Sequence, residues 1–430
     1  MNTTETLHQH FLASSGACTD TRAIGTGCMF FALKGPNFNA NAFAQQALEK
    51  GARWAVVDDA TVVQDERFLL VPDVLKALQD LARHHRRQFD IPVVAITGTN
   101  GKTTTKELVH AVLSADRPTL ATSGNLNNHI GVPLTLLRLA AEHRIAIIEM
   151  GANHVGDIAE LVAIAEPTHG LITNIGRAHL EGFGSYEGVV KAKTEMYDFL
   201  GTHGGTLFVN TDDALLLQKS AGLPRVTYGR QADADTAGDT ASTGPFMELV
   251  FAGCDGQAYH VSTQLIGDYN LPNALAAVAI GQHFGVPDER IAAALSTYTP
   301  SNSRSEFRDT GRNHLVLDAY NANPSSMQVA LENFASMPTN RPKLAVLGGM
   351  KELGADSTAE HTAIVDAVKR LGIEAIFVGP EFGTLSGRGI STYPDAVAAL
   401  EAFKQKPLTG HLVLVKGSRG TKLETLVDGL

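Results

Sequence analysis

The stretch ITGTNGKTTTKELV, residues 96–109, decides the fold of this chain. Apolar residues precede it, two glycines bracket a short loop, and Lys102 followed by three threonines opens a helical pattern. This order predicts a strand, a glycine loop and a helix. Backbone amides of such a loop and the helix N-terminus bind phosphate groups, the lysine adds positive charge, and a threonine hydroxyl can ligate Mg2+. We therefore expect the chain to bind a nucleoside triphosphate.

The loop is shorter than the common phosphate-binding loop. Its glycines are Gly98 and Gly101, and Ile96 stands where the common loop has its first glycine. The resulting form is G-x-x-G-K-T, which differs from the loop of most kinases and GTPases. An ordinary glycine turn with a solvated lysine is the alternative. The flanking strand and helix patterns favour the phosphate-binding interpretation.

Length and composition indicate a globular protein of several domains. The 430 residues suggest about three domains at ~150 residues each. No apolar run approaches the ~20 residues of a membrane helix, and the first residues lack the basic start and apolar stretch of a signal peptide. We expect a cytoplasmic protein with no membrane partner.

The net charge and the cysteine content argue against further kinds of ligand. The net charge of −10 argues against nucleic acid, so an anionic nucleotide must be bound locally by the loop, lysines and Mg2+. The cysteines Cys18, Cys28 and Cys254 form no C-x-x-C pair, which argues against a zinc site or a disulfide framework. We expect a monomer that acts on small molecules.

The hydrophobic pattern divides the chain into three segments, residues 1–90, 91–298 and 299–430. Each alternates short apolar runs with helical patterns, which is typical of α/β domains with mostly parallel sheets, and the third reads as doubly wound. In the middle segment, two alternating runs between residues 246 and 265 predict an added hairpin. The Ala-, Asp- and Thr-rich stretch 231–244 is predicted to be a loop.

The expected elements follow from these periodicities. Strands are expected at residues 29–33, 54–58, 68–71, 93–97, 145–150, 171–175, 207–210, 315–319, 343–347, 375–378 and 412–415. Helices are expected at residues 40–50, 74–89, 325–337 and 358–371.

Polar side chains stand where two of the expected strands end. Glu149 ends the apolar strand 145–150, and a carboxylate in this position beside the phosphate-loop strand is typical of a metal ligand. A solvent-facing acid is the alternative, and the very apolar strand favours the metal role. His179 follows the next strand, 171–175, and is expected at the same edge of the sheet.

Two lysines and several amides are further candidates. Lys191 and Lys193 stand at alternate positions of a predicted helix, so we expect one to point into the site and the other to be solvated. Small and amide side chains at residues 122–129 either support a phosphate or substrate site or serve as turn and cap residues. Asn273 opens a later helix, where contact with adenine and helix capping are both open.

A last group of candidates lies at the junction of the second and third segments, where a cleft can form. Arg304 lies at the start of the third segment, and Asp318 begins the motif DAYNANP at the end of its first strand. Lys416 and Arg419 follow the last strand and make a basic turn.

Taken together, these motifs resemble those of the Mur ligase family, over nearly the whole chain. The resemblance is carried by TGTNGKTTTKE, GNLNNHIGVPLTLL, EMGANHVGDI, HLEGFGSYEGVVKAK, NLPNALAA, DAYNANPSSM and LVKGSR. Within the family, GNLNN and YNANP resemble the member that adds a dipeptide, and FFALKG resembles its UDP-substrate domain.

The resemblance implies an α/β fold and an activity. The fold would comprise a small N-terminal α/β UDP-substrate domain, a central P-loop-like ATPase domain with a mostly parallel sheet, and a C-terminal Rossmann-like domain. The activity would be ATP-dependent amide ligation in cytoplasmic peptidoglycan precursor synthesis. ATP would phosphorylate the terminal carboxylate of a UDP-N-acetylmuramoyl-tripeptide, and the amine of D-alanyl-D-alanine would displace the phosphate. The third residue of the peptide, diaminopimelate or lysine, is left open.

The resemblance also implies residue roles. Catalytic residues would be Lys102, His179 and Lys193, the last carbamylated, because a carbamate is an anionic oxygen ligand for a cation. Two Mg2+ ions would be held by Thr103, Glu149, His179 and Lys193. ATP would contact Gly98, Thr99, Asn100, Gly101, Lys102, Thr103, Thr104, Asn273, Arg304 and Asp318. The other substrates would contact Asp20, Thr21, Arg22, Lys34, Asn125, Asn127, Asn128, Tyr320, Asn321, Asn323, Lys416 and Arg419.

Three other interpretations remain. The nearest is a sibling ATP-dependent ligase that adds a single amino acid, such as folylpolyglutamate synthase or another Mur member. A non-catalytic nucleotide-binding regulator is disfavoured by the intact set of expected metal ligands. A plain kinase is disfavoured by the short loop and by the third segment, which would have no purpose.

Overall fold

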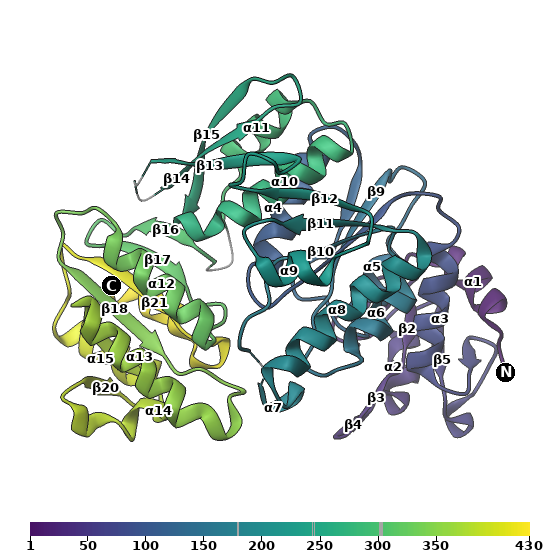
Figure 1. The fold of residues 1–430 in the computed structure, drawn as a ribbon. Helices are drawn as coiled ribbons and strands as arrows, with labels where there is room; N and C mark the ends of the chain where they lie inside the picture. The colour runs from purple at the N-terminus through teal and green to yellow at the C-terminus, as the bar shows by residue number, and fades with distance from the viewer. Residues whose placement is uncertain (179, 243, 245, 301–303) are drawn as a thin grey trace.

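The computed structural model describes residues 1–178, 180–242, 244, 246–300 and 304–430. It confirms the predicted mixed α/β class: three sheets of four, nine and six strands follow one another along the chain. Figure 1 shows the N-terminal region at one end of the molecule and the C-terminal region at the other. The strands of each sheet lie within one of the three predicted segments, whose exact boundaries stay predictions.

The N-terminal sheet is parallel and buried on both faces. Its order is β1 (Ala17–Cys18), β2 (Met29–Phe31), β5 (Trp54–Val57) and β6 (Phe68–Leu70). Successive side chains of a strand point to opposite faces. Met29 and Phe31 therefore pack toward helices α1 (Thr4–Leu12) and α3 (Val74–Arg86), while Phe30 packs toward α2 (Ala44–Glu49). A short hairpin, β3 (Lys34–Gly35) with β4 (Phe38–Asn39), follows β2.

The central sheet places the phosphate-loop strand β7 between β9 and β10. The order is β15-β14-β13-β12-β11-β10-β7-β9-β8, parallel from β8 to β13 and antiparallel from β13 to β15. The predicted hairpin is confirmed as β14 and β15. The bounds are β7 Val93–Thr97, β8 Thr119–Ala121, β9 Ile145–Glu149, β10 His169–Ile172, β11 Thr206–Asn210, β12 Arg225–Gly229, β13 Thr236–Ser242, β14 Phe246–Ala252 and β15 Ala258–Ile266.

The predicted loop 231–244 is wrong in its second half, where β13 forms. The residues of β13, TAGDTAS, have low strand propensity, but pairing with β12 on one side and β14 on the other overrides it. Gly238 is needed there, because a Cβ would lie 2.6 Å from Leu275 Cδ2 and 2.7 Å from the Val250 carbonyl oxygen. A second shift concerns β10, which ends at Ile172 and leaves Thr173–Ile175 outside the strand.

Helices cover both faces of the central sheet. On one face α4 (Lys102–Ser114), α10 (Leu271–His283) and α11 (Asp288–Thr297) share a core with Val94 and Ile96. On the other face α5 (Gly131–Leu136), α6 (Asp157–Ala165) and α8 (Tyr186–His203) pack on Val93 and Ala95. Two short helices, α7 (Leu180–Phe183) and α9 (Ala214–Lys219), flank α8 in sequence.

The C-terminal sheet has the order β16-β17-β21-β18-β19-β20, parallel except for β16 at its edge. The bounds are β16 Glu306–Asp309, β17 His314–Asp318, β18 Lys343–Gly348, β19 Glu374–Val378, β20 Ser391–Tyr393 and β21 Leu412–Lys416. The main helices are α12 Pro324–Ser336, α13 Ser357–Leu371 and α15 Ala396–Gln405, with the short α14 at Pro380–Gly383. Among the residues described, no helix is long and apolar enough to cross a membrane.

The N-terminal and central regions share one hydrophobic core. Helix α3 contacts both α5 and α6, and one cluster of buried side chains runs from Leu7 and Leu78 to Leu136 and Leu161. The first 90 residues therefore pack against helices of the central region and are not joined to it by the linker alone.

A chain of buried imidazoles crosses this boundary. His8 Nε2 lies 3.1 Å from His85 Nδ1, and His85 Nε2 lies 3.0 Å from the Leu139 carbonyl oxygen. Because a carbonyl only accepts, His85 Nε2 carries a hydrogen and donates it. Burial lowers the pKa of both His8 and His85, and the nearby His84 lowers both further.

This histidine pair predicts acid sensitivity of the folded state. Because the folded pKa of each histidine lies below its unfolded value of about 6.5, the stability they contribute is complete above that pH and is lost as pH falls toward the folded pKa. We expect the urea midpoint of unfolding to fall as the pH decreases below about 6.5. In His85→Gln, which keeps a donor for Leu139 but cannot titrate, the fall should be smaller. An equal fall in both proteins would contradict this account.

Candidate active site

The predicted strand, glycine loop and helix are confirmed as β7, residues 98–101 and α4. Both glycines have positive φ, +144° at Gly98 and +80° at Gly101, which other residues rarely adopt. Neither position has room for a Cβ: it would lie 1.9 Å from Thr173 Oγ1 at Gly98 and 2.6 Å from Asn273 Oδ1 at Gly101. The loop is therefore pressed against β10 and α10, and only glycine fits.

Lys102 opens α4 and bends back over the loop. Its Nζ donates to the carbonyl oxygens of Gly98 at 2.7 Å and Thr99 at 3.1 Å. Burial lowers the pKa of Lys102; the charge of Glu149 opposes this shift, and that of Arg304 adds to it. The ammonium group thus lies at the mouth of the glycine loop, where a phosphate chain would be bound.

The segment after β10 clamps this loop. Thr173 Oγ1 donates to the Asn100 carbonyl oxygen at 2.6 Å, and Asn174 Nδ2 donates to the same oxygen at 3.0 Å. Asn174 Oδ1 in turn accepts from the Asn100 backbone N–H at 3.0 Å. Neither residue is among the predicted site residues, because both were predicted to lie inside the strand 171–175. Their polar side chains directly after an apolar run were the available signal.

Glu149 is placed beside the loop by the sheet register, which pairs it with Ile96. Only 1% of the residue is exposed. Its Oε1 accepts from Asn127 Nδ2 at 2.8 Å, while its buried Oε2 has no hydrogen-bond partner among the residues described. A buried carboxylate oxygen without a partner is costly, and a cation would satisfy it. The donor set at this point therefore fits Mg2+.

The other predicted metal ligands are placed as follows. Thr103 lines the same cleft as Glu149. His179 lies outside the described residues, so its predicted role stays a prediction. Within the described part of the chain, no group of three or more His, Cys, Asp or Glu side chains could hold a metal ion. The predicted Mg2+ ligands differ from such a group, because they include the hydroxyl of Thr103 and a carbamate on Lys193.

The two lysines of α8 differ in exposure as the sequence predicts, but Lys193 is not among the residues that line the cleft, so its place in the site stays a prediction. Lys191 is exposed, whereas only 3% of Lys193 is exposed. Burial and the positive charge of Lys102 lower the pKa of Lys193 to about 7. Its Nζ lies 5.8 Å from the centre of the Phe183 ring. Burial thus favours the neutral amine, which is the form that can react with CO2.

One cleft of about 910 Å³ collects most of the predicted residues. It lies between the central sheet and the C-terminal domain and is lined by residues from both. The predicted residues that line it are Thr99, Asn100, Gly101, Lys102, Thr103, Thr104, Asn125, Asn127, Asn128, Glu149, Asn273, Arg304, Asp318, Tyr320, Asn321, Asn323 and Lys416. Arg419 lines a neighbouring cavity of about 230 Å³.

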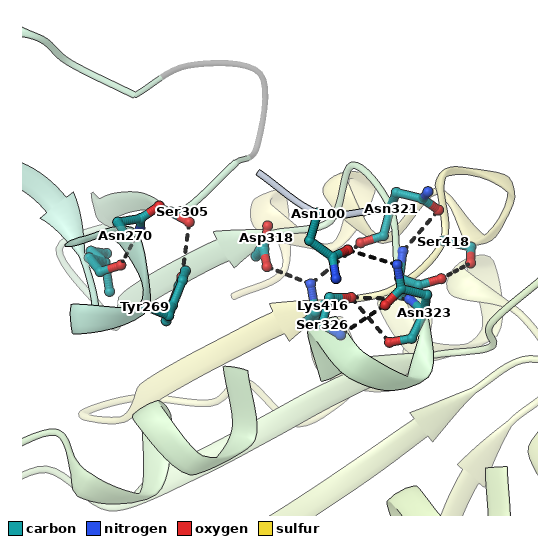
Figure 2. Close-up of polar contacts among 12 residues, drawn as sticks. Asn100, Tyr269, Asn270, Ser305, Asp318, Asn321, Asn323, Ser326, Lys416 and Ser418 are labelled. Carbon is teal, nitrogen blue, oxygen red and sulfur yellow. Dashed lines mark hydrogen bonds and ion pairs between the residues drawn. The ribbon is translucent and has the colours of Figure 1, made fainter. Parts of the chain in front are cut away.

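The C-terminal side of the cleft is organised by two sets of contacts. Lys416 is 2% exposed, and its Nζ lies 2.5 Å from Asp318 Oδ2, as Figure 2 shows. Arg304 stacks on the Tyr320 ring at 3.6 Å, and Arg419 lies 5.2 Å from the same ring. Each positive charge predicted here already has a partner that fixes its position.

The predicted UDP-substrate residues lie in the N-terminal region and do not line the cleft. Arg22 forms an exposed ion pair with Asp20 at 2.7 Å, and Lys34 pairs with Asp58 at 2.7 Å. Asn41 also donates to Asp58 and so fixes its carboxylate. The cation Lys34, at the start of β3, is thus held by Asp58, a residue that was not among the predicted site residues.

Comparison with known proteins tests the resemblance. The family model of the Mur ligase middle domain matches residues 96–281, and that of the Mur ligase glutamate ligase domain matches residues 303–419. UDP-N-acetylmuramoyl-tripeptide--D-alanyl-D-alanine ligase of Escherichia coli is 39% identical over 426 residues, which cover 96% of this chain and 92% of that protein. The chain belongs to the Mur ligase family.

Other relatives are similar to this Mur ligase over nearly its whole length. The Bacillus subtilis protein named UDP-N-acetylmuramoyl-tripeptide--D-alanyl-D-alanine ligase is 34% identical, over 96% of this chain and 93% of that protein. The crystal structure I of MurF from Acinetobacter baumannii superposes with a TM-score of 0.88 at 31% identity, over 99% and 98% of the two chains. MurF ligase from Thermotoga maritima in complex with ADP superposes at 0.83, with 27% identity over 97% of each chain.

The clamp on the glycine loop can be tested by substitution. Asn174→Ala removes two hydrogen bonds to the Asn100 backbone, each worth roughly 1 kcal/mol, so we expect binding of ADP by this Mur ligase to weaken by up to roughly 30-fold. Asn174→Asp keeps the acceptor, but it places a carboxylate oxygen against the Asn100 carbonyl oxygen and adds negative charge near the loop, so its affinity for ADP should fall at least as far. Isothermal titration calorimetry measures all three proteins. Unchanged affinity in Asn174→Ala would show that the clamp does not shape the loop.

Proposed function

We propose that this Mur ligase joins D-alanyl-D-alanine to a UDP-N-acetylmuramoyl-tripeptide with ATP as the energy source. The observation that carries the proposal is the shared cleft. The glycine loop with Lys102, the half-paired carboxylate of Glu149 and the C-terminal residues around Asp318 and Tyr320 face one space. The relatives of this name, which match over the whole chain, support this choice of substrates.

The reaction has two steps. The terminal carboxylate of the tripeptide attacks the γ-phosphorus of ATP, which gives an acyl phosphate and ADP. The dipeptide amine then attacks the acyl carbon, the C–O bond to phosphate breaks, and the amine loses a proton. The products are an amide, ADP and inorganic phosphate.

The first step brings one anion toward another, so the site must supply positive charge. Lys102 and the backbone amides of the loop lie at the phosphate side, and Arg304 faces them from the C-terminal side. Water must be kept from the acyl phosphate, and docking of the C-terminal domain over the cleft would exclude it.

Bound Mg2+ would supply further positive charge at the phosphate oxygens. Glu149 and Thr103 would hold one ion, and we propose that Lys193, as a carbamate, and His179 hold a second. The neutral amine of Lys193 attacks CO2, forms a C–N bond and releases a proton. Burial of Lys193 supports this step, because it disfavours the ammonium form.

The remaining substrate residues lie in the cleft, in the neighbouring cavity and in the N-terminal region. Asn125 and Asn128 line its central side and are proposed to contact the peptide. Asp20, Thr21, Arg22 and Lys34 are proposed to contact the uridine end. For the dipeptide end we propose both Lys416, which lines the cleft and is paired with Asp318, and Arg419, which lines the neighbouring cavity. We also propose a cytoplasmic monomer.

Omission of substrates one at a time tests the function. We expect inorganic phosphate to be released only when ATP, the UDP-tripeptide and D-alanyl-D-alanine are all present, and one 18O atom to pass from a labelled carboxylate to phosphate. Lys102→Ala is the inactive control. Turnover with a single amino acid in place of the dipeptide would indicate a sibling ligase. Nucleotide binding without phosphate release under any condition would indicate a regulator.

The carbamate is tested separately. Lys193→Ala should lose most ligase activity because an anionic ligand is missing, and a small carboxylic acid added in solution should restore part of it. The matched control is Lys191→Ala on the exposed face of α8, which should keep normal activity. Absence of rescue, together with no mass increase on Lys193 in the intact protein at high bicarbonate, would rule the carbamate out.

A further inference from the structure

Asn323 lies at the start of α12 and is fixed there by a capping box. Its Oδ1 accepts from the Ser326 backbone N–H at 2.8 Å, and Ser326 Oγ accepts from the Asn323 backbone N–H at 3.1 Å. This reciprocal pair holds the asparagine amide in one orientation on the C-terminal domain.

The other end of the same amide reaches the central domain. Asn323 Nδ2 donates to Asn100 Oδ1 at 2.7 Å, and Figure 2 shows the two side chains pointing toward each other. Asn100 belongs to the glycine loop, and its backbone N–H and carbonyl are already engaged by Thr173 and Asn174. The central domain thus holds the backbone of this loop residue, and the C-terminal domain holds its side chain.

Neighbouring contacts show that the two domains meet over a surface and not only at the hydrogen bond between Asn323 and Asn100. The Arg177 backbone N–H donates to Ser325 Oγ at 3.2 Å, and the Arg177 guanidinium lies 3.7 Å from Glu360. A Cβ on Gly176 would lie 3.0 Å from Ser325 Oγ, so the two domains are in close contact here. Asn323 is 8% exposed, which protects its hydrogen bond to Asn100 from competing water.

We propose that Asn323 is a positioning residue that couples docking of the C-terminal domain to the shape of the phosphate-binding loop. The inference rests on the proposed function and deepens it. When the domain docks, Asn323 fixes the Asn100 side chain, and a nucleotide that orders the loop favours docking in return, because such coupling is reciprocal. The consequence for the reaction is that the acyl phosphate forms only in a cleft closed to water.

Asn323→Ser separates this role from helix capping. Serine is a good N-cap residue and keeps the bond to Ser326, but its side chain ends one bond short of the amide nitrogen that reaches Asn100. We expect an unchanged thermal midpoint, ADP binding roughly fivefold weaker, and more than one phosphate released per amide formed. Gln328→Ser, on the same helix but bonded to Glu332, is the surface control and should behave as wild type.

A double-mutant cycle with Asn100→Ser decides whether the two side chains act as a pair. We expect the effects on ADP affinity of the two single substitutions to be non-additive, so that the double variant is little weaker than Asn100→Ser alone. The inference would be overturned if the two substitutions weakened ADP binding by factors that multiply in the double variant. It would also be overturned if Asn323→Ser released the same amount of phosphate per amide as the wild-type protein. If the wild-type protein forms no amide at all, the proposed function fails, and the ADP cycle still decides the coupling.

Discussion

The close approach between the glycine loop and the end of β10 is the constraint on which the rest of the site depends. At Gly98 the two backbones leave no space for a side chain, because Thr173 occupies the position of a Cβ. This contact brings Thr173 and Asn174 within hydrogen-bonding distance of Asn100. It also fixes the start of α4, and with it Lys102. The parallel pairing of β7 with β9 and β10 then places Glu149 at the same edge of the sheet.

The electrostatics of the site follow from this packing. Lys193 is buried and Lys102 is partly buried, and loss of solvation lowers the pKa of each. Glu149 has one oxygen bound by Asn127 and the other without a protein partner among the described residues. Such a set is suited to hold anionic phosphate and a cation together, and it would be costly in a protein that bound neither.

Much of this arrangement could be predicted from local sequence. The β7 strand, the glycine loop and α4 follow from hydrophobic periodicity and glycine spacing, and the hairpin of β14 and β15 from alternation. The different faces of Lys191 and Lys193 follow from helix geometry alone. The prediction failed at β13. Its small polar residues show no strand pattern, and the strand forms because it pairs with β12 and β14.

The contacts missed in the site have the same physical origin. The bonds of Asn127 to Glu149, of Asn174 to Asn100 and of Asn323 to Asn100 join residues separated by 22, 74 and 223 positions. No local periodicity reports such pairs, although the residue types were recognisable as candidates. Asn127 and Asn323 were named as substrate contacts, a role that stays a prediction. The structure adds that each also holds another residue of the site in place.

The core shared by α3, α5 and α6 has a consequence for how this enzyme can be rebuilt. A graft that exchanged the first 90 residues for those of a relative would also have to match Leu136 and Leu161 on the recipient, since these side chains pack in the same cluster as Leu78. The C-terminal domain has two clusters of buried side chains, and among the described residues only Ile266 of β15 joins one of them from the central region. The other contacts across this junction include the Phe246–Phe307 ring pair and the hydrogen bonds of Asn323 and Ser325. Modular exchange should therefore succeed more readily at the later junction than at the earlier one.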